Sequence, residues 1–332
     1  MTNRPDPRRM SRRTMIAQAA LGATAALVAG GPGPVHAGTQ ENPGRKAMPF
    51  GYCLNTATIR GQQLTLSEEA AIAAKAGYQG FEPWVPEIQQ YVQRGGKLAD
   101  LKKRIADLGL TVPSAIGFAD WINDDAARRT AGLEQWKRDA EMVALIGGRR
   151  LAAPPGGAYN TALNLLTVAQ RYRKLLEVGC AAGVVPELEL WGGSKTLSRL
   201  GEIAFVLVEA AHPQACGLLD VFHIYKGGSD FTGLRLFNGA SLHVLHMNDY
   251  PTEPPREKLS DADRVYPGDG SAPLVALMRN LQTIGFSGML SLELFNRQYW
   301  KLDALTVART GLEKTRAIVD RASLLGAHPN GV

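Results

Sequence analysis

GLLDVFH (residues 217–223) begins as an apolar run suited to a buried strand, and it ends in Asp220 and His223. Strands that are buried on both faces of a parallel sheet read as continuous apolar runs. An unpaired carboxylate is costly in such surroundings. The acid and the imidazole at the end of this run therefore predict a parallel strand that delivers polar side chains to a functional site.

Four successive apolar runs end in a polar residue of this kind, namely Glu189, Asp220, His246 and Glu293. In a parallel barrel the functional groups come from the C-terminal ends of the strands, so these side chains are expected to converge. Carboxylates that converge without a partner repel each other, and a divalent cation removes that cost. Three carboxylates and one imidazole suit Mn²⁺, Mg²⁺, Co²⁺ or Zn²⁺. We therefore predict that these four residues bind one divalent metal ion, with Mn²⁺ as the first candidate.

The run VVPELELWGG contains two acids, and strand geometry decides between them. Glu187 and Glu189 are two residues apart and share one face of a strand. Glu189 lies nearer the end of the run and is followed by Trp191, so we assign it as the ligand. Glu187 is expected to support the ligands or to pair with a base. His243 lies three residues before His246, so a regular strand turns its side chain to the opposite face, toward the helices.

Short apolar runs alternate along the chain with longer segments whose apolar residues recur at three- and four-residue steps, which indicates strand–helix units. The runs lie at residues 50–54, 80–85, 112–118, 150–153, 184–190, 216–222, 242–247 and 289–295. A parallel strand needs a crossover helix each time, so eight units predict an α/β fold, a single (β/α)8 TIM barrel over residues 49–325. A doubly wound open sheet is the alternative, but no glycine-rich nucleotide motif follows the first run. Residues 38–48 are expected to form a linker and residues 326–332 a C-terminal tail.

The first 37 residues have the features of an export signal. A basic segment precedes an apolar stretch at residues 15–28, and small residues lead up to Ala37. Arg12 and Arg13 resemble the twin-arginine signal. The apolar stretch is short for a membrane span of about 20 residues, which argues against a stable membrane anchor. We therefore predict recognition by the twin-arginine export machinery, cleavage after Ala37, and a periplasmic or secreted protein.

The charge and the cysteines exclude several classes of protein. The chain has 332 residues, with 37 Lys and Arg against 31 Asp and Glu. Most of this excess lies in the leader, so the remainder gives no reason to expect nucleic acid as a partner. Cys53, Cys180 and Cys216 are odd in number and far apart, which argues against a disulfide framework but leaves one pair open. The sequence also leaves a homo-oligomer open.

The segments LELWG, LLDVFH, HMND, RVYPGDG and SLELF together resemble the xylose isomerase-like barrel superfamily, a group of sugar isomerases and epimerases. The resemblance extends by pattern over the whole chain after the leader. It implies a small-molecule carbohydrate substrate and one divalent metal ion held by the four strand-end residues named above. It also implies that His223 and Arg264 contact the substrate. In the ketose 3-epimerase branch the two metal-bound glutamates move the proton, which gives Glu189 and Glu293 the catalytic roles. That branch tends to follow its histidine with Glu-Asn, whereas this chain has Met247-Asn248.

Three further residues are expected at the substrate. Glu82 ends the second run, where it either binds substrate or pairs with a base. Trp191 offers an apolar face on which a sugar ring can stack. Asp249 follows the strand that carries His246. With His223 and Arg264 they complete the predicted substrate-binding set.

The leading functional hypothesis is a metal-dependent isomerase or epimerase that moves a proton next to a carbonyl of a free sugar or keto-sugar. A lyase or hydrolase of 3-keto-glycosides is the alternative on the same metal site. An exported, non-catalytic sugar-binding protein is a third hypothesis, although binding alone needs no acid–base pair. A DNA-repair endonuclease of this fold needs many more histidines than the chain contains.

Overall fold

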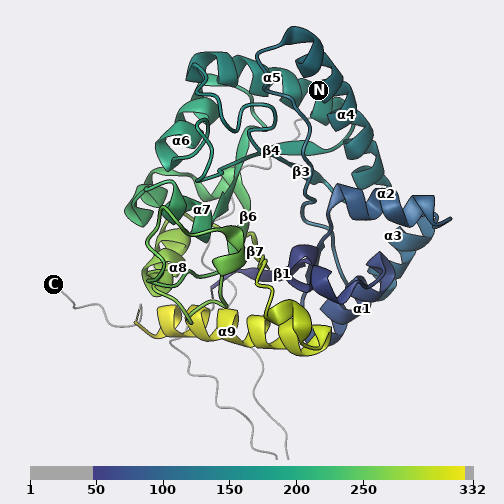
Figure 1. Cartoon of the computed structure of the whole chain (residues 1–332), viewed down its shortest axis with the longest axis vertical. Coiled ribbons are helices and arrows are strands. Elements are labelled where there is room, and N and C mark those ends of the chain that lie inside the picture. The colour runs from purple at the N-terminus through teal and green to yellow at the C-terminus, as the bar shows by residue number, and fades with distance from the viewer. Residues whose placement is uncertain (1–47, 326–332) are drawn as a thin grey trace, which may run out of the picture. The chain divides into compact units, whose positions relative to one another are not determined.

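Parallel strands form one sheet in the order β2-β1-β7-β6-β5-β4-β3 (Figure 1). The computed structural model describes residues 48–325. Within that range the sheet has seven strands, whose bounds are Gly51–Asn55 (β1), Gly80–Glu82 (β2), Arg150–Ala153 (β3), Val185–Glu189 (β4), Cys216–Asp220 (β5), Leu242–Met247 (β6) and Met289–Leu292 (β7). All the strand pairs are parallel, as the alternation of apolar runs and helical segments predicts.

Helices connect the strands and lie around the sheet (Figure 1). The α-helices are Leu66–Ala76 (α1), Val85–Gln93 (α2), Leu98–Asp107 (α3), Ala126–Leu145 (α4), Leu165–Ala181 (α5), Leu200–Glu209 (α6), Val221–Lys226 (α7), Leu274–Thr283 (α8) and Ala304–Leu325 (α9). Short 3-10 helices span Thr56–Gln62 (η1), Phe231–Leu236 (η2), Gly239–Ser241 (η3), Asp261–Asp263 (η4) and Tyr299–Lys301 (η5). The last helix, α9, packs against α1 and α8.

The ends of α1 illustrate how local sequence sets the helix limits. Thr65 accepts a hydrogen bond from the backbone N–H of Glu68, and the Glu68 carboxylate accepts one from the N–H of Thr65. This reciprocal pair satisfies two of the backbone donors that a helix start leaves free. Gly77 ends the helix with φ 99°, a left-handed conformation that suits glycine.

One predicted strand is wrong. In place of a strand at 112–118, the chain makes isolated bridges. Thr111 and Ile116 pair with the β2 region, and Ala115 exchanges hydrogen bonds with β3. Pro113 has no N–H to donate, so a regular ladder cannot continue through this segment. The segment nevertheless lies between β2 and β3, the two ends of the seven-stranded sheet, and joins them.

The apolar residues divide into two groups. Most of them lie in one large cluster. A smaller cluster comprises Ile116, Ala152, Leu218 and Val244, which come from the 111–116 segment and from β3, β5 and β6. Parallel barrels fill their interior with such inward-facing side chains, so the interior is a packed core and the open site lies above it.

The predicted leader, the predicted tail and all of the predicted linker except Met48 lie outside the described residues. Among residues 48–325, none of the helices combines the length and apolar character needed to cross a membrane.

Candidate active site and metal centre

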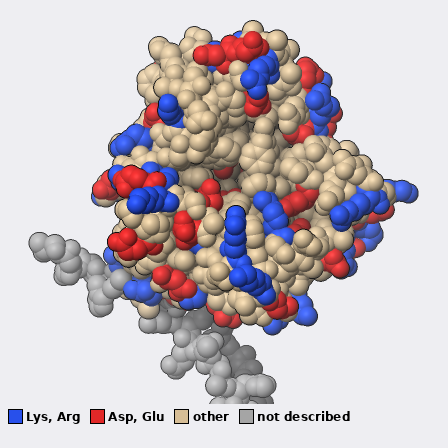
Figure 2. Space-filling view, in the orientation of Figure 1, with Lys and Arg blue, Asp and Glu red and all other residues tan. Residues whose placement is uncertain are grey.

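A cavity of about 420 Å³ is lined by residues from the C-terminal ends of the strands and the loops after them. Figure 2 shows the molecule hollowed near the centre of one face. Glu189, Trp191, His223, Arg264 and Glu293 line the cavity, so five residues predicted to act together share one site.

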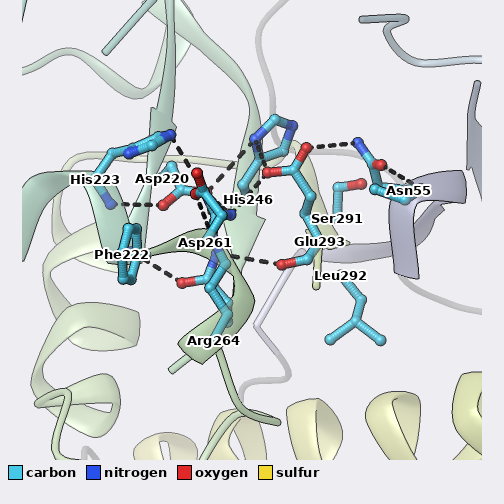
Figure 3. Close-up of polar contacts among 12 residues, drawn as sticks. Asn55, Asp220, Phe222, His223, His246, Asp261, Arg264, Ser291, Leu292 and Glu293 are labelled. Carbon is cyan, nitrogen blue, oxygen red and sulfur yellow. Dashed lines mark hydrogen bonds and ion pairs between the residues drawn. The ribbon is translucent and has the colours of Figure 1, made fainter. Parts of the chain in front are cut away.

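Asp220 is the last residue of β5 and also the N-cap of α7. Its Oδ1 accepts the backbone N–H of His223 at 2.7 Å, the contact of a helix N-cap. Its Oδ2 accepts from Asn248 Nδ2 at 3.0 Å and from Arg264 Nη1 at 2.8 Å. Burial alone would raise the pKa of Asp220, but Arg264, His223 and His246 together outweigh burial and the pKa is lowered. Asp220 is therefore a fixed, buried carboxylate that points into the site (Figure 3).

Glu293 directly follows β7 and reaches the same point. Its Oε2 accepts from Arg264 Nη1 at 2.8 Å, and its Oε1 accepts from Asn55 Nδ2 at 3.2 Å. One guanidinium nitrogen thus joins Asp220 and Glu293, as Figure 3 shows. Arg264 is 1% exposed, and its other nitrogens are held by Asp261 at 2.6 and 3.1 Å.

His246 lies among three carboxylates. Its Nδ1 is 3.2 Å from Glu293 Oε2 and 3.7 Å from Asp220 Oδ2, and its Nε2 is 3.2 Å from Glu82 Oε2. Burial by itself lowers the pKa of His246, but Glu293 and Glu82 outweigh burial and hold it well above its usual value. The surroundings of Nδ1 therefore favour a positive charge at this position.

Three of the four predicted ligands form the closest group. Asp220, His246 and Glu293 each offer one ligand atom, and these atoms lie within 4.8 Å of one another. Glu189 lines the same cavity from the end of β4 but is not part of that group. Its Oε2 is buried without a hydrogen-bond partner, as is His246 Nδ1. Buried polar atoms without partners, in a set of carboxylates and an imidazole, fit a divalent cation.

Burial shifts the pKa values of Glu189 and His223 away from those of solvent-exposed side chains. Burial raises the pKa of Glu189 to about 8, so its carboxyl holds a proton at neutral pH in these surroundings. Burial also lowers the pKa of His223, which keeps its ring neutral. Arg264 can only donate, and its Nη2 lies 3.2 Å from His223 Nε2. The His223 proton is therefore on Nδ1, which is buried and has no partner.

The structure places two predicted substrate contacts away from the cavity wall. Glu82 is fully buried, and its Oε2 accepts from Ser291 at 2.6 Å and from Asn55 at 2.9 Å. Asp249 is buried and accepts backbone N–H groups of Gly268, Gly270 and Ala272. Glu82 lies beside His246 Nε2, which matches the alternative that it pairs with a base, and Asp249 organises the PGDG turn; the described lining of the cavity does not include either residue.

Three residues of the site were not among the site residues predicted from the sequence. Asn55 ends β1 and bonds both Glu82 and Glu293. Asn248 follows β6 and bonds Asp220. Both stand at strand ends, a signal by which the sequence could have revealed them. Asp261 lies in a long loop after β6, and no pattern in the sequence connects it with Arg264.

Comparison with known proteins gives a consistent result. The family described as "Xylose isomerase-like TIM barrel" matches residues 70–318. Inosose isomerase of Bacillus velezensis is 27% identical over 275 residues, which cover 81% of this chain and 97% of that protein. A 3-dehydroshikimate dehydratase of Pseudomonas aeruginosa is 26% identical over 266 residues, 77% of this chain and 41% of that protein.

The fold also matches a solved structure. The IOLI protein with a bound zinc atom has a TM-score of 0.76 and 22% identity, and the match covers 82% of this chain and 99% of that one. This similarity confirms the predicted α/β barrel. Together with the family match over three quarters of the sequence, it shows that the chain belongs to the xylose isomerase-like TIM barrel family.

Proposed function

We propose that this protein is a divalent-metal-dependent isomerase or epimerase that moves a proton next to the carbonyl of a free sugar or keto-sugar. The observation that carries the proposal is the meeting of Glu189 and Glu293 in one cavity beside Asp220 and His246. The two glutamates come from β4 and β7, which are three places apart in the sheet, so they approach a bound molecule from different sides. The similarity to an inosose isomerase supports the same class of reaction.

The metal ion would be held by Asp220, His246, Glu293 and Glu189. When bound, a divalent ion in such a site polarises a carbonyl and lowers the cost of removing the adjacent proton. Mn²⁺ is our first candidate, with Mg²⁺, Co²⁺ and Zn²⁺ as alternatives, because the set has three carboxylates and one nitrogen.

The protein's own groups divide the proton transfer between them. Burial makes Glu189 take up a proton readily when no metal ion is bound, and so it suits the role of acid. Glu293 is held as an acceptor by Arg264 and Asn55 and suits the role of base. His223 lines the cavity with a neutral ring, and Arg264 Nη2 at 3.2 Å from its Nε2 fixes the orientation of that ring. In the reverse direction the two glutamates exchange roles.

The proposal is tested by hydrogen exchange. The metal-loaded protein is incubated in D₂O with inosose and a panel of neutral ketoses, and incorporation of deuterium next to the carbonyl is followed. Glu189→Gln and Glu293→Gln should each lower turnover by about two to four powers of ten while metal binding falls only in part. Glu187→Gln, two residues along β4, is the matched control and should keep turnover. Turnover at the wild-type rate in both metal-replete variants would show that the chemistry lies elsewhere.

An elimination on the same site is the second candidate. The similarity to a dehydratase is the observation that favours it. A 3-keto-glycoside lyase or hydrolase also begins by removing a proton next to a carbonyl, but it then expels a leaving group. Release of the free aglycone from a 3-keto-glycoside identifies this reaction. Binding without deuterium exchange or release would instead indicate a sugar-binding protein.

A further inference from the structure

The two basic side chains that line the cavity already bond to other groups of the protein, which are backbone carbonyls or carboxylates. Among the described residues these are Lys226 and Arg264. Lys226 Nζ donates to the backbone carbonyls of Arg256, Glu257 and Leu259 at 3.0, 2.9 and 2.7 Å, which uses all three of its protons. Neither cation is free to bind an anion.

Acidic side chains also line the cavity. Glu189, Asp261 and Glu293 line it, and Asp261 and Glu293 are the partners of Arg264. A phosphate or carboxylate that lies away from the metal ion would therefore lose its hydration and meet no free cationic side chain among the described residues that line the cavity.

A second feature of the cavity is a continuous series of aromatic rings, which we name the aromatic belt: Tyr159, Trp191, Phe118, Trp84 and Phe295. Ring centroids of successive members are 6.1, 6.1, 5.0 and 5.9 Å apart. Phe118 and Tyr159 are 36% and 46% exposed and therefore lie at the mouth, whereas the charged floor is buried. The cavity thus has a polar inner zone and an apolar outer zone.

The aromatic belt is held in place. Trp84 Nε1 donates to Asn55 Oδ1 at 2.9 Å, and the same asparagine bonds Glu293 in the floor. The Arg60 guanidinium lies over the Trp84 ring, 3.8 Å from its centroid. Asn55 therefore fixes the distance between Trp84 in the aromatic belt and the Glu293 carboxylate in the floor.

The volume exceeds that of one sugar ring. At roughly 30 Å³ for each water molecule, the cavity of about 420 Å³ holds the equivalent of about 14 waters. Covalently bonded atoms pack more closely than separate water molecules, so a hexose bound at the floor leaves the outer zone unfilled.

We propose that the substrate is an uncharged keto-sugar that carries an aromatic substituent, with the sugar at the polar floor and the substituent in the aromatic belt. The sugar half of this inference rests on the proposed function. The substituent and the exclusion of anions rest on the belt and on the two paired cations. By this argument 3-dehydroshikimate, a carboxylate, is not a substrate.

Three probes with one sugar framework test the inference: phenyl 3-keto-β-D-glucoside, its methyl analogue, and phenyl 3-keto-β-D-glucuronide. Binding to the metal-loaded protein is followed by the fluorescence of the tryptophans in the belt. The phenyl glucoside should bind about tenfold or more tightly than the methyl glucoside. The glucuronide should bind at least tenfold more weakly than the phenyl glucoside.

Matched variants locate the effect. Phe118→Ala should remove the preference for phenyl over methyl. Phe205→Ala truncates a phenylalanine of nearly equal exposure, 38%, on α6 outside the cavity, and should keep the preference. Equal affinities for phenyl and methyl probes, or an unchanged affinity for the glucuronide, would overturn the inference. Deuterium exchange with equal affinities for the phenyl and methyl probes would support the proposed function and overturn the inference about the substituent. Selective binding of the phenyl probe without deuterium exchange would support the inference about the substituent and count against the proposed function.

Discussion

His246 and Glu82 form a buried pair at the centre of the site. The pair leaves Nδ1 directed at Asp220 and Glu293, because Nε2 faces the Glu82 carboxylate. Glu82 is itself fixed by Asn55 and Ser291. Histidines that bind metals usually donate their second ring N–H to such a carboxylate, which sets the tautomer and the ring orientation. Glu82 is therefore a positioning residue for His246.

Changing Glu82→Gln should weaken divalent metal binding by about 10- to 100-fold, because the amide keeps the size of the side chain but does not hold the imidazole in one tautomer. Competition with a chromophoric chelator measures the dissociation constant.

The control for this variant is Glu187→Gln. Glu187 is also fully buried, and burial raises its pKa to about 8, so it is neutral at pH 7 and Gln resembles it closely. Metal affinity should stay at the wild-type value. Equal losses in the two variants would show that any change in the barrel interior disturbs the site, and would remove the specific role of Glu82.

The sequence predicted which strand ends bring polar side chains together, but it did not predict how deeply each side chain is buried. Alternation along a strand tells which face a side chain takes, and so it placed Glu189 at the cavity. It does not tell how far below the open end a side chain lies, which is why Glu82 was expected at the substrate. The contacts of Asp249 could not be read from the strand pattern either, since its partners are the amides of a turn 19 to 23 residues later.

At the scale of elements, α1 contains a buried acid. Glu69 is 4% exposed, and burial raises its pKa from 4.5 to about 9. Below about pH 4.5 the folded and unfolded chains both carry the proton, so it does not affect stability. As the pH rises toward 9, the unfolded chain releases its proton and the folded chain retains it, so stability is lost progressively.

Glu69→Gln should therefore stabilise the protein at pH 7 by roughly 1–3 kcal/mol and leave it unchanged near pH 4. Urea unfolding at the two pH values measures the difference. Glu68→Gln on the same helix is the comparison: the Thr65 cap lowers the pKa of Glu68, so its contribution is lost as the pH falls. A gain from Glu69→Gln of the same size at both pH values would contradict a titration effect.

The elements themselves were largely predictable, because periodicity and capping act locally. α1 begins at the Thr65–Glu68 capping box and ends at a glycine, as its sequence indicates. Two differences arose from the tertiary structure. VPEIQQYVQ follows β2 at once as α2, whereas the sequence favoured a longer strand there. The apolar run at 112–118 contains Pro113 and packs into the barrel without forming a ladder.

At the scale of the whole molecule, a bound metal ion should stabilise the fold. Ligands that bind only the folded state add about 2.7 kcal/mol at 100 times their dissociation constant. For a domain of this size that raises Tm by roughly 5–10 °C. Calorimetry with and without Mn²⁺ tests the shift. Asp220→Asn keeps a capping residue for α7 and should reduce the shift sharply. A full shift in this variant would place the bound ion at another site.

Export is a prediction from the leader. The mature chain should begin after Ala37 and be found in the periplasm or the medium. N-terminal sequencing of the fractionated protein measures both. Replacing Arg12 and Arg13 by Lys should leave the precursor in the cytoplasm. Wild-type protein found in the cytoplasm with its leader intact would end this proposal, without affecting the barrel or its site.

The junction through residues 111–116 has a consequence for how this barrel can diverge. β4 to β7, whose ends supply the predicted ligands, are contiguous in the sheet. The irregular junction lies beyond them, next to β3, where Ala115 makes the connection. Insertions, recombination or new termini on that side therefore change loops and closure outside the four strands whose ends supply the predicted ligands, and they reach the site only through Glu82 at the end of β2. The barrel is in this sense modular: one half supplies the predicted metal ligands, and the other supplies Trp84 and Phe118 of the aromatic belt.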